Sequence, residues 1–446
     1  MFVDAWRTFA PLCGLLALAS ITPAWAAPKI ESWETGNGAR VLFVTAPDLP
    51  ILDIRLAFDA GSARDGERSG LAALTSAMLS QGAGEWDANA LAERLESVGA
   101  SLGTGSQRDM AFVSLRTLTE KEPMDTALDT LAAVVAEPRF DQADFDRVRE
   151  NTLVGLRQDE QDPGTVGTKA LYRAIFGDHP YAADPGGTLE SVGKLGRERL
   201  VEHHRRYYVA RNAVVAMVGA LTRDEAEAVA ERVTAGLAPG ERAPSPPPVP
   251  EPREARRVEI DFPSSQTHIY VGQPGMQRDD PDYFPLYVGN HILGGNGLVS
   301  LLMDEVREKR GLSYSVYSYF LPMAQRGPFL MGLQTKNDQA ELARGVLMDT
   351  LTRFRDRGPT EQELAAAIKN ITGGFPLRIA SNAKIVEYLA MIGFYRLPLD
   401  YLDVFTERVS AVTAEDIRGA FRRRLDPKRF VTVIVGPREG QVAEAR

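Results

Sequence analysis

The chain has 446 residues, of which 44% are hydrophobic and 25% charged, values typical of a soluble globular protein. This length is enough for two or three domains, each with a full core. The net charge of −9 argues against a general affinity for nucleic acid or anionic lipid.

Residues 1–26 have the features of a secretory signal peptide. Arg7 precedes a short apolar run, and Ala24-Trp25-Ala26 matches the small-x-small pattern of a cleavage site. The only cysteine, Cys13, lies inside this segment, so the mature chain would form no disulfide. We therefore expect a periplasmic protein, and no later segment is long and apolar enough to predict a transmembrane helix.

Residues 28–237 are predicted to form a first domain. A hairpin turn is indicated at Gly36-Asn37-Gly38, between two strand-like runs. Apolar and polar residues then alternate over residues 53–59, which predicts a half-buried strand. The run from Gly70 to Ser80 predicts a buried helix.

Residues 238–254 are rich in proline, which fills neither a central strand nor a helix, and they are predicted to be a linker. Residues 255–446 would form a second domain, because the segment 407–436 repeats the pattern of 190–219 without gaps at an offset of 217. We expect an α+β fold with two homologous domains, each a mostly antiparallel sheet covered by helices on one face.

The most informative stretch runs from residue 294 to residue 320. It predicts a turn at Gly294-Gly295-Asn296-Gly297 and then an amphipathic helix that ends at Gly311. The apolar face of that helix would carry Leu298, Leu301, Leu302 and Val306. A strand is predicted around Tyr314, Val316 and Tyr319. The reversal from helix to strand would bring Arg307 and Tyr314 onto one surface.

This stretch closely resembles the C-terminal half of the M16 (pitrilysin-like) zinc peptidases, in their two-domain bacterial branch. The resemblance implies that Arg307 and Tyr314 help to grip a bound peptide. An arginine offers a planar fork of donors to carbonyl groups, and a tyrosine hydroxyl can donate to a carbonyl oxygen or a developing oxyanion. The alternative is an arginine on a solvated helix end beside a tyrosine that caps a strand.

The same resemblance shows where a zinc site is missing. Catalytic members carry His-x-x-Glu-His on an early helix, with a distal Glu that completes the metal site. The two histidine positions fall here on Ala73 and Ala77, the general base on Ser76, and the distal Glu on Gly155. A methyl group cannot bind zinc and a serine is a poor base, so the resemblance implies a chain that does not cut peptides by itself.

The five histidines do not suggest another metal site. His179, His268 and His291 are scattered, and the adjacent His203 and His204 would point to different faces of a helix. The run from His203 to Arg206 is predicted to be a solvated helix face. We expect no cofactor in this chain.

Three functions are compatible with this pattern. The leading hypothesis is a non-catalytic, substrate-gripping subunit of a periplasmic heterodimeric M16 metallopeptidase, in which a zinc-motif partner hydrolyses an unfolded peptide. The alternative is a structural, assembly or peptide-holding protein with no role in proteolysis. The third is a metallopeptidase with an unrecognised site.

Overall fold

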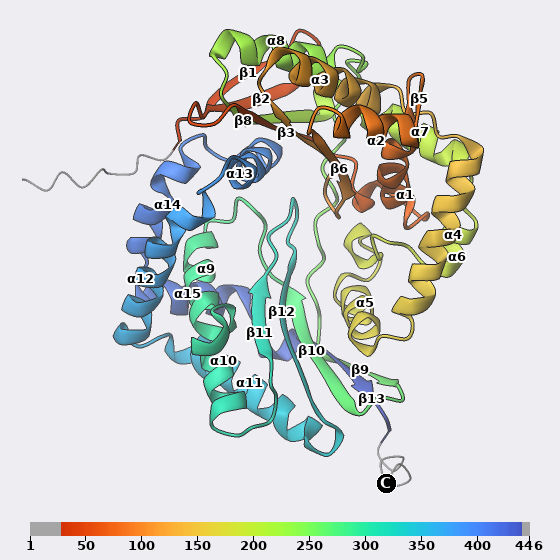
Figure 1. The fold of residues 1–446 in the computed structure, drawn as a ribbon. Coiled ribbons are helices and arrows are strands. Elements are labelled where there is room, and N and C mark those ends of the chain that lie inside the picture. The colour runs from red at the N-terminus through yellow and green to blue at the C-terminus, as the bar shows by residue number, and fades with distance from the viewer. Residues whose placement is uncertain (1–27, 439–446) are drawn as a thin grey trace, which may run out of the picture.

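The computed structural model describes residues 28–438, so the predicted signal peptide lies outside the described residues. It contains two large sheets, one from each half of the chain (Figure 1). The strand order is β1-β2-β8-β3-β7-β6 in the first sheet and β11-β12-β10-β13-β9 in the second. The strands of the first sheet are β1 (Glu31–Glu34), β2 (Arg40–Thr45), β3 (Ile51–Phe58), β6 (Ser101–Ser106), β7 (Ala111–Leu118) and β8 (Ala213–Gly219). Those of the second are β9 (Arg256–Asp261), β10 (Gln266–Pro274), β11 (Val316–Phe320), β12 (Pro328–Lys336) and β13 (Val431–Gly436).

The two sheets share one topology. Neighbouring strands are antiparallel except for β2 beside β8 and β9 beside β13, which are parallel. In each sheet a late strand, β8 or β13, is inserted between two early ones. This confirms the predicted repeat, because β8 and β13 end the two matching segments 190–219 and 407–436.

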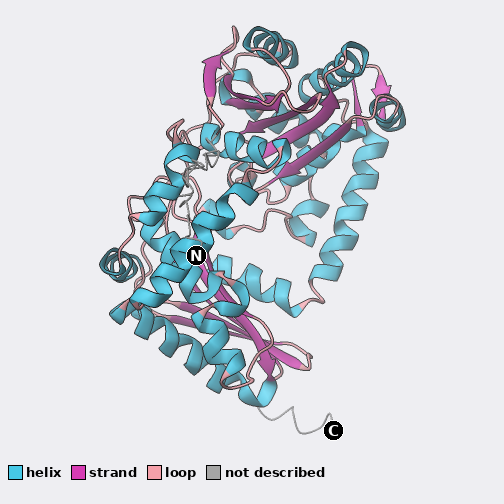
Figure 2. Ribbon diagram, turned by 60° about the vertical axis from the view of Figure 1, so that its left-hand side comes forward, coloured by secondary structure: helices cyan, strands magenta, loops and turns pink. Residues whose placement is uncertain are grey.

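Helices cover both sheets (Figures 1 and 2). The helices of the first half are α1 (Leu71–Met78), α2 (Ala88–Glu96), α3 (Lys121–Ala136), α4 (Gln142–Asp159), α5 (Pro163–Phe176), α6 (Leu189–Gly193), α7 (Arg197–Tyr207) and α8 (Arg223–Thr234). Those of the second half are α9 (Tyr283–Asn290), α10 (Leu301–Met303), α11 (Ala340–Arg357), α12 (Glu361–Arg378), α13 (Asn382–Phe394), α14 (Tyr401–Ser410) and α15 (Ala414–Arg424). The predicted hairpin at Gly36–Gly38 is confirmed by β1 and β2, and the predicted buried helix is α1.

Each half also contributes one helix to the sheet of the other half. Helix α5 packs on β10 and β13, and α13 packs on β3 and β8. Both contacts use a glycine: a Cβ added at Gly167 of α5 would lie 2.4 Å from Tyr270 Cε2, and one at Gly393 of α13 would lie 2.4 Å from Val214 Cγ1. The backbones of these helices therefore approach the sheets more closely than any larger residue would allow.

The exchanged helix α13 explains why the prediction of a half-buried β3 was wrong. Both faces of β3 are largely buried, and Asp53 in this strand is only 5% exposed. Its carboxylate accepts two hydrogen bonds from Arg116, at 2.9 and 3.0 Å. Alternating polarity normally indicates a strand with one solvent-exposed face. Here α13, more than 300 residues away in the chain, covers that face.

The proline-rich segment 238–254 contains no helix or strand. It is nevertheless fastened to the body of the protein. The Nε2 of His179 lies 2.8 Å from the Pro247 carbonyl oxygen, and Arg326 donates to the Val249 carbonyl oxygen at 3.2 Å. Val249 is buried in a cluster with side chains of α5, β10 and β13.

Candidate functional site

The segment before Arg307 differs from the predicted single helix. The α9 helix continues into a π-helical turn (His291–Gly295), followed by a 3-10 turn (Gly297–Val299), α10 and a second π-helical segment (Asp304–Glu308). Gly294 and Gly295 therefore lie at the end of a helix, and the predicted turn begins only at Asn296. A Cβ at Gly294 would lie 2.5 Å from Ser318 Oγ, so the glycine allows close packing on β11. Leu298, predicted to be on the apolar face, is instead 67% exposed.

Arg307 and Tyr314 meet as predicted. The Cζ atom of Arg307 lies 4.5 Å from the centroid of the Tyr314 ring, within the range of a cation–π contact. Gly311, with φ of +60°, ends the helical segment, and its amide donates to the Arg307 carbonyl oxygen at 2.8 Å. Tyr314 was predicted to lie in a strand, but β11 begins only at Val316, and Tyr314 is 79% exposed.

The backbone on both sides of Tyr314 is anchored to β12. The buried Ser313 hydroxyl lies 2.7 Å from the carbonyl oxygens of both Ser315 and Gln334, to which it can donate. Thr335 donates to the Leu312 carbonyl oxygen at 2.5 Å. An exposed phenol is therefore presented from a fixed loop, which reduces the conformational entropy lost when it binds a ligand.

The arginine keeps donors available beside this phenol. Arg307 makes one ion pair in the described chain, a 3.4 Å contact with the adjacent Glu308, and its side chain is partly exposed. Both side chains therefore keep hydrogen-bond donors available to a ligand at this surface. Arg307 itself lies within the π-helical segment Asp304–Glu308, a rare irregularity that is frequent at functional sites.

The positions that would hold zinc in a catalytic relative have no ligand. Ala73, Ser76 and Ala77 lie on α1, and Gly155 lies on α4, which contacts α1. A Cβ at Gly155 would meet no atom within 4 Å. There is room for a longer side chain at that position, so packing does not account for the absence of a carboxylate there.

The α1 helix itself is well formed without ligands. Gly70 precedes it in a left-handed conformation with φ of +94°. The Asp65 carboxylate accepts hydrogen bonds from the Gly70 amide at 2.9 Å and the Ala72 amide at 2.8 Å. These contacts satisfy amides of the first turn that have no partner within the helix.

The adjacent histidines are core residues, so the prediction of a solvated face was wrong for them. His203 and His204 are 4% and 7% exposed. Their Nε2 atoms lie 3.2 Å from the Ala60 carbonyl oxygen and 2.9 Å from the Val135 carbonyl oxygen, on different sides of α7 as predicted. Burial lowers the pKa of each to about 4. Within residues 28–438, no three His, Cys, Asp or Glu side chains are grouped closely enough to hold a metal ion.

Asp109 was not identified from the sequence, yet it joins distant segments. Its carboxylate accepts hydrogen bonds from Tyr181 Oη at 2.6 Å, Tyr395 Oη at 2.9 Å and the Ala324 amide at 2.7 Å. Tyr181 comes from the first half, and the other two from the second. An isolated aspartate between two strands gives no local signal of such a role. Ser313 did carry a local signal, because serine side chains often hydrogen-bond to neighbouring backbone groups in turns.

Comparison with known proteins identifies the family. Residues 40–188 match the family model described as "Insulinase (Peptidase family M16)". Residues 194–371 match the model described as "Peptidase M16 inactive domain". The chain belongs to peptidase family M16. A crystal structure of a peptidase M16 inactive domain from Pseudomonas fluorescens is 40% identical, covers 92% of this chain and 99% of its own, and superposes with a TM-score of 0.90.

Sequence relatives of this M16 chain include proteins described as peptidases and one described otherwise. An uncharacterized zinc protease of Streptomyces coelicolor is 26% identical over 81% of this chain and 79% of its own. The non-peptidase homolog YmxG of Helicobacter pylori is 28% identical over 83% of this chain and 85% of its own. With alanine, serine and glycine at the four zinc-site positions, the chain is a non-catalytic M16 protein.

None of the helices within residues 28–438 combines the length and the apolar character that crossing a bilayer requires.

Proposed function

We propose that this chain is the substrate-gripping subunit of a periplasmic heterodimeric M16 metallopeptidase. A zinc-motif M16 partner would supply the metal and the general base, and the substrate would be an unfolded peptide. One observation carries the proposal: Arg307 and Tyr314 form an anchored, exposed pair, while the zinc-site positions of the same chain hold no ligand.

The chemistry of the pair fits the peptide backbone. An extended peptide can add as a strand to a sheet edge of the partner, which gives affinity without strict sequence choice. Its remaining carbonyl groups are acceptors for the guanidinium of Arg307 and the phenol of Tyr314. Charge-assisted hydrogen bonds contribute about 1.5–3 kcal/mol each, and a donor aimed at the developing oxyanion contributes about 2.7–4 kcal/mol to the rate.

The test is to co-express the chain with a zinc-motif M16 homologue and to measure cleavage of an unstructured peptide. Arg307→Ala and Tyr314→Phe should each lower kcat/KM by about 10- to 150-fold, the factors that correspond to 1.5–3 kcal/mol. Size-exclusion chromatography should show that both variants still assemble with the partner, because neither change removes a buried side chain.

Arg310→Ala is the matched control, since Arg310 lies three residues from Arg307 and pairs with Glu305 at 2.7 Å. It should leave cleavage unchanged. Full activity of both Arg307→Ala and Tyr314→Phe would refute the gripping role and leave assembly or peptide holding. Cleavage by the isolated chain in a chelator-sensitive manner would refute the non-catalytic assignment itself.

The periplasmic location is part of this proposal and rests on the sequence of residues 1–26. It predicts that the protein recovered from its native host starts close to Ala27 and fractionates with periplasmic markers. N-terminal sequencing of the recovered protein measures the first point and subcellular fractionation the second, and a chain that retains Met1 in the cytoplasmic fraction would contradict them.

A further inference from the structure

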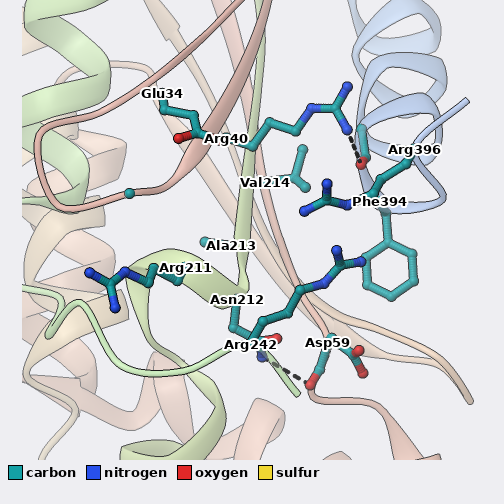
Figure 3. Close-up of a pocket in the computed structure, with 12 residues that line it drawn as sticks. Glu34, Arg40, Asp59, Arg211, Asn212, Ala213, Val214, Arg242, Phe394 and Arg396 are labelled. Atoms are coloured by element: carbon teal, nitrogen blue, oxygen red, sulfur yellow. Dashed lines mark hydrogen bonds between the residues drawn. The ribbon is translucent and has the colours of Figure 1, made fainter. Parts of the chain in front are cut away.

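A polar cavity of about 300 Å³ lies where the two halves and the linker meet (Figure 3). Arg40, at the start of β2, lines it from the first sheet. Arg242 comes from the proline-rich segment, and Arg396 comes from the residues directly after α13. In Figure 3 the guanidinium groups of these three residues lie together, whereas that of Arg211 points away. The volume is at the lower end of the range for small-molecule sites.

The three guanidinium groups have no ion-pair partner within residues 28–438, although the Glu34 carboxylate also lines the cavity. In the described part of the chain, Arg40, Arg242 and Arg396 take part in no ion pair, and the one hydrogen bond that they donate runs from Arg40 Nη1 to the Gly393 carbonyl oxygen at 3.4 Å. Asp59 also lines the cavity, but its carboxylate is held by Arg64 through two hydrogen bonds of 2.8 and 2.7 Å.

The charges of these arginines disfavour one another. Burial lowers the pKa of Arg40 below its usual value, and the charge of Arg396 lowers it further. The pKa of Arg242 is lowered by burial first, and then by Arg396 and Arg40. The Glu34 and Asp59 carboxylates, which also line the cavity, raise the pKa of Arg40 and Arg242 respectively, but burial and the neighbouring arginines outweigh them. Positive charge is thus gathered at one half-enclosed place in a protein with a net charge of −9.

Arg396 occupies a backbone position that favours glycine. Its φ is +54°, and the amides of Arg396 and Leu397 donate to the Gly393 and Ile392 carbonyl oxygens at 3.3 and 2.9 Å. These are the two hydrogen bonds of a Schellman motif, in which the left-handed residue is usually glycine. An arginine there costs backbone free energy and gains none from an ion pair. A binding role for its side chain would account for that cost.

We propose that Arg40, Arg242 and Arg396 form a binding site for a small polyanion, either a phosphate ester or a polycarboxylate. Both offer several oxygens that accept paired hydrogen bonds from planar guanidinium groups. The bound anion would neutralise the arginines and connect β2 of the first half, the linker and the end of α13 from the second half. Occupancy would therefore hold the two halves together at a place remote in sequence from Arg307 and Tyr314.

The test is isothermal titration of the full mature chain at low ionic strength with inorganic pyrophosphate, citrate and sodium chloride. We expect saturable binding of pyrophosphate or citrate, and the tighter of the two identifies the anion class. Arg242→Ala and Arg396→Gly should each weaken that binding at least fivefold. Arg256→Ala, which removes a charge from the exposed start of β9, is the matched control and should leave the affinity unchanged.

The Arg396→Gly variant is also expected to fold stably, because glycine suits the left-handed backbone there. Its thermal midpoint without anion should equal or exceed that of the wild type, while the rise caused by pyrophosphate or citrate should shrink. Binding no tighter than that of chloride, or equal weakening by Arg256→Ala, would overturn the proposal. So would unchanged affinity in both Arg242→Ala and Arg396→Gly.

Discussion

The buried histidines of α7 should make the fold sensitive to acid. His203 and His204 have a pKa of about 4 in the folded protein, against 6.5 for an exposed histidine, because burial disfavours their charged forms. The unfolded chain therefore binds more protons than the folded one between these values. The free energy of folding that comes from keeping these two histidines neutral is fully present above pH 6.5 and is lost as the pH falls toward 4.

The size of the effect follows from the two pKa values. At pH 5 an unfolded histidine is almost fully protonated, whereas His203 and His204 in the folded protein remain mostly neutral. Linkage gives a loss of about 2 kcal/mol per histidine between pH 7 and pH 5, or about 4 kcal/mol for the pair if they titrate independently. That is a large part of the 5–15 kcal/mol that typically stabilises a folded domain.

The assay is urea unfolding of the wild type and of His203→Gln/His204→Gln at pH 7 and pH 5. A glutamine can still donate to the Ala60 or Val135 carbonyl oxygen, but it does not titrate. The comparison with the variant is essential because Asp65 also titrates in this range. Burial raises the pKa of Asp65 to about 7, so its contribution to the free energy of unfolding increases as the pH falls. The difference in unfolding free energy between the two proteins removes that contribution.

We expect this difference to move by about 4 kcal/mol in favour of the variant from pH 7 to pH 5. His268→Gln is the control, because His268 is only partly buried and should produce a smaller movement. A difference that stays constant within 1 kcal/mol would refute the conclusion that the two imidazoles are buried in their neutral form.

Two further predictions concern the exchanged helix and the Tyr314 loop. Gly393→Ala should destabilise the protein by about 1–3 kcal/mol in urea unfolding, because its Cβ would lie 2.4 Å from Val214. Gly345→Ala, on α11 with no atom within 4 Å of its Cβ, should be stabilising by about 0.5–1 kcal/mol; equal effects would contradict the close packing. Ser313→Ala should lower kcat/KM of the partnered enzyme by about 2- to 10-fold, since it releases the loop from β12. If Ser313 acts by positioning Tyr314, its effect should nearly vanish in a Tyr314→Phe background, and effects that simply multiply would refute that role.

Local patterns in the sequence predicted much of the fold. The Asn-Gly turn predicted the first hairpin, and the glycine at position 311 predicted a helix end that the structure places there with φ of +60°. The matched segments 190–219 and 407–436 predicted the repeat. In the first two cases a few neighbouring residues determine the conformation, so the chain carries that information locally.

The prediction failed where distant segments meet. Nothing within residues 53–59 indicates that α13 will cover β3. The need for glycine at position 393 becomes clear only from its close packing on Val214 in the folded protein. The arginine cavity is assembled from positions 40, 242 and 396, which no spacing rule connects. Leu298 was misplaced because π-helical turns shift the register that a 3.6-residue period assumes.

The pattern of burial on α1 explains how the fold can persist without the zinc ligands. Leu71, Leu74 and Met78 are buried at helical spacing and hold the helix in the core of the first half. Ala73 and Ala77, at the two histidine positions, are only partly buried and lie outside that set. Ligands at these two positions are therefore not required for packing, and their absence leaves the apolar face of the helix intact. Since α1 packs without these ligands, the fold alone does not indicate hydrolysis, and activity must be inferred from the ligands residue by residue.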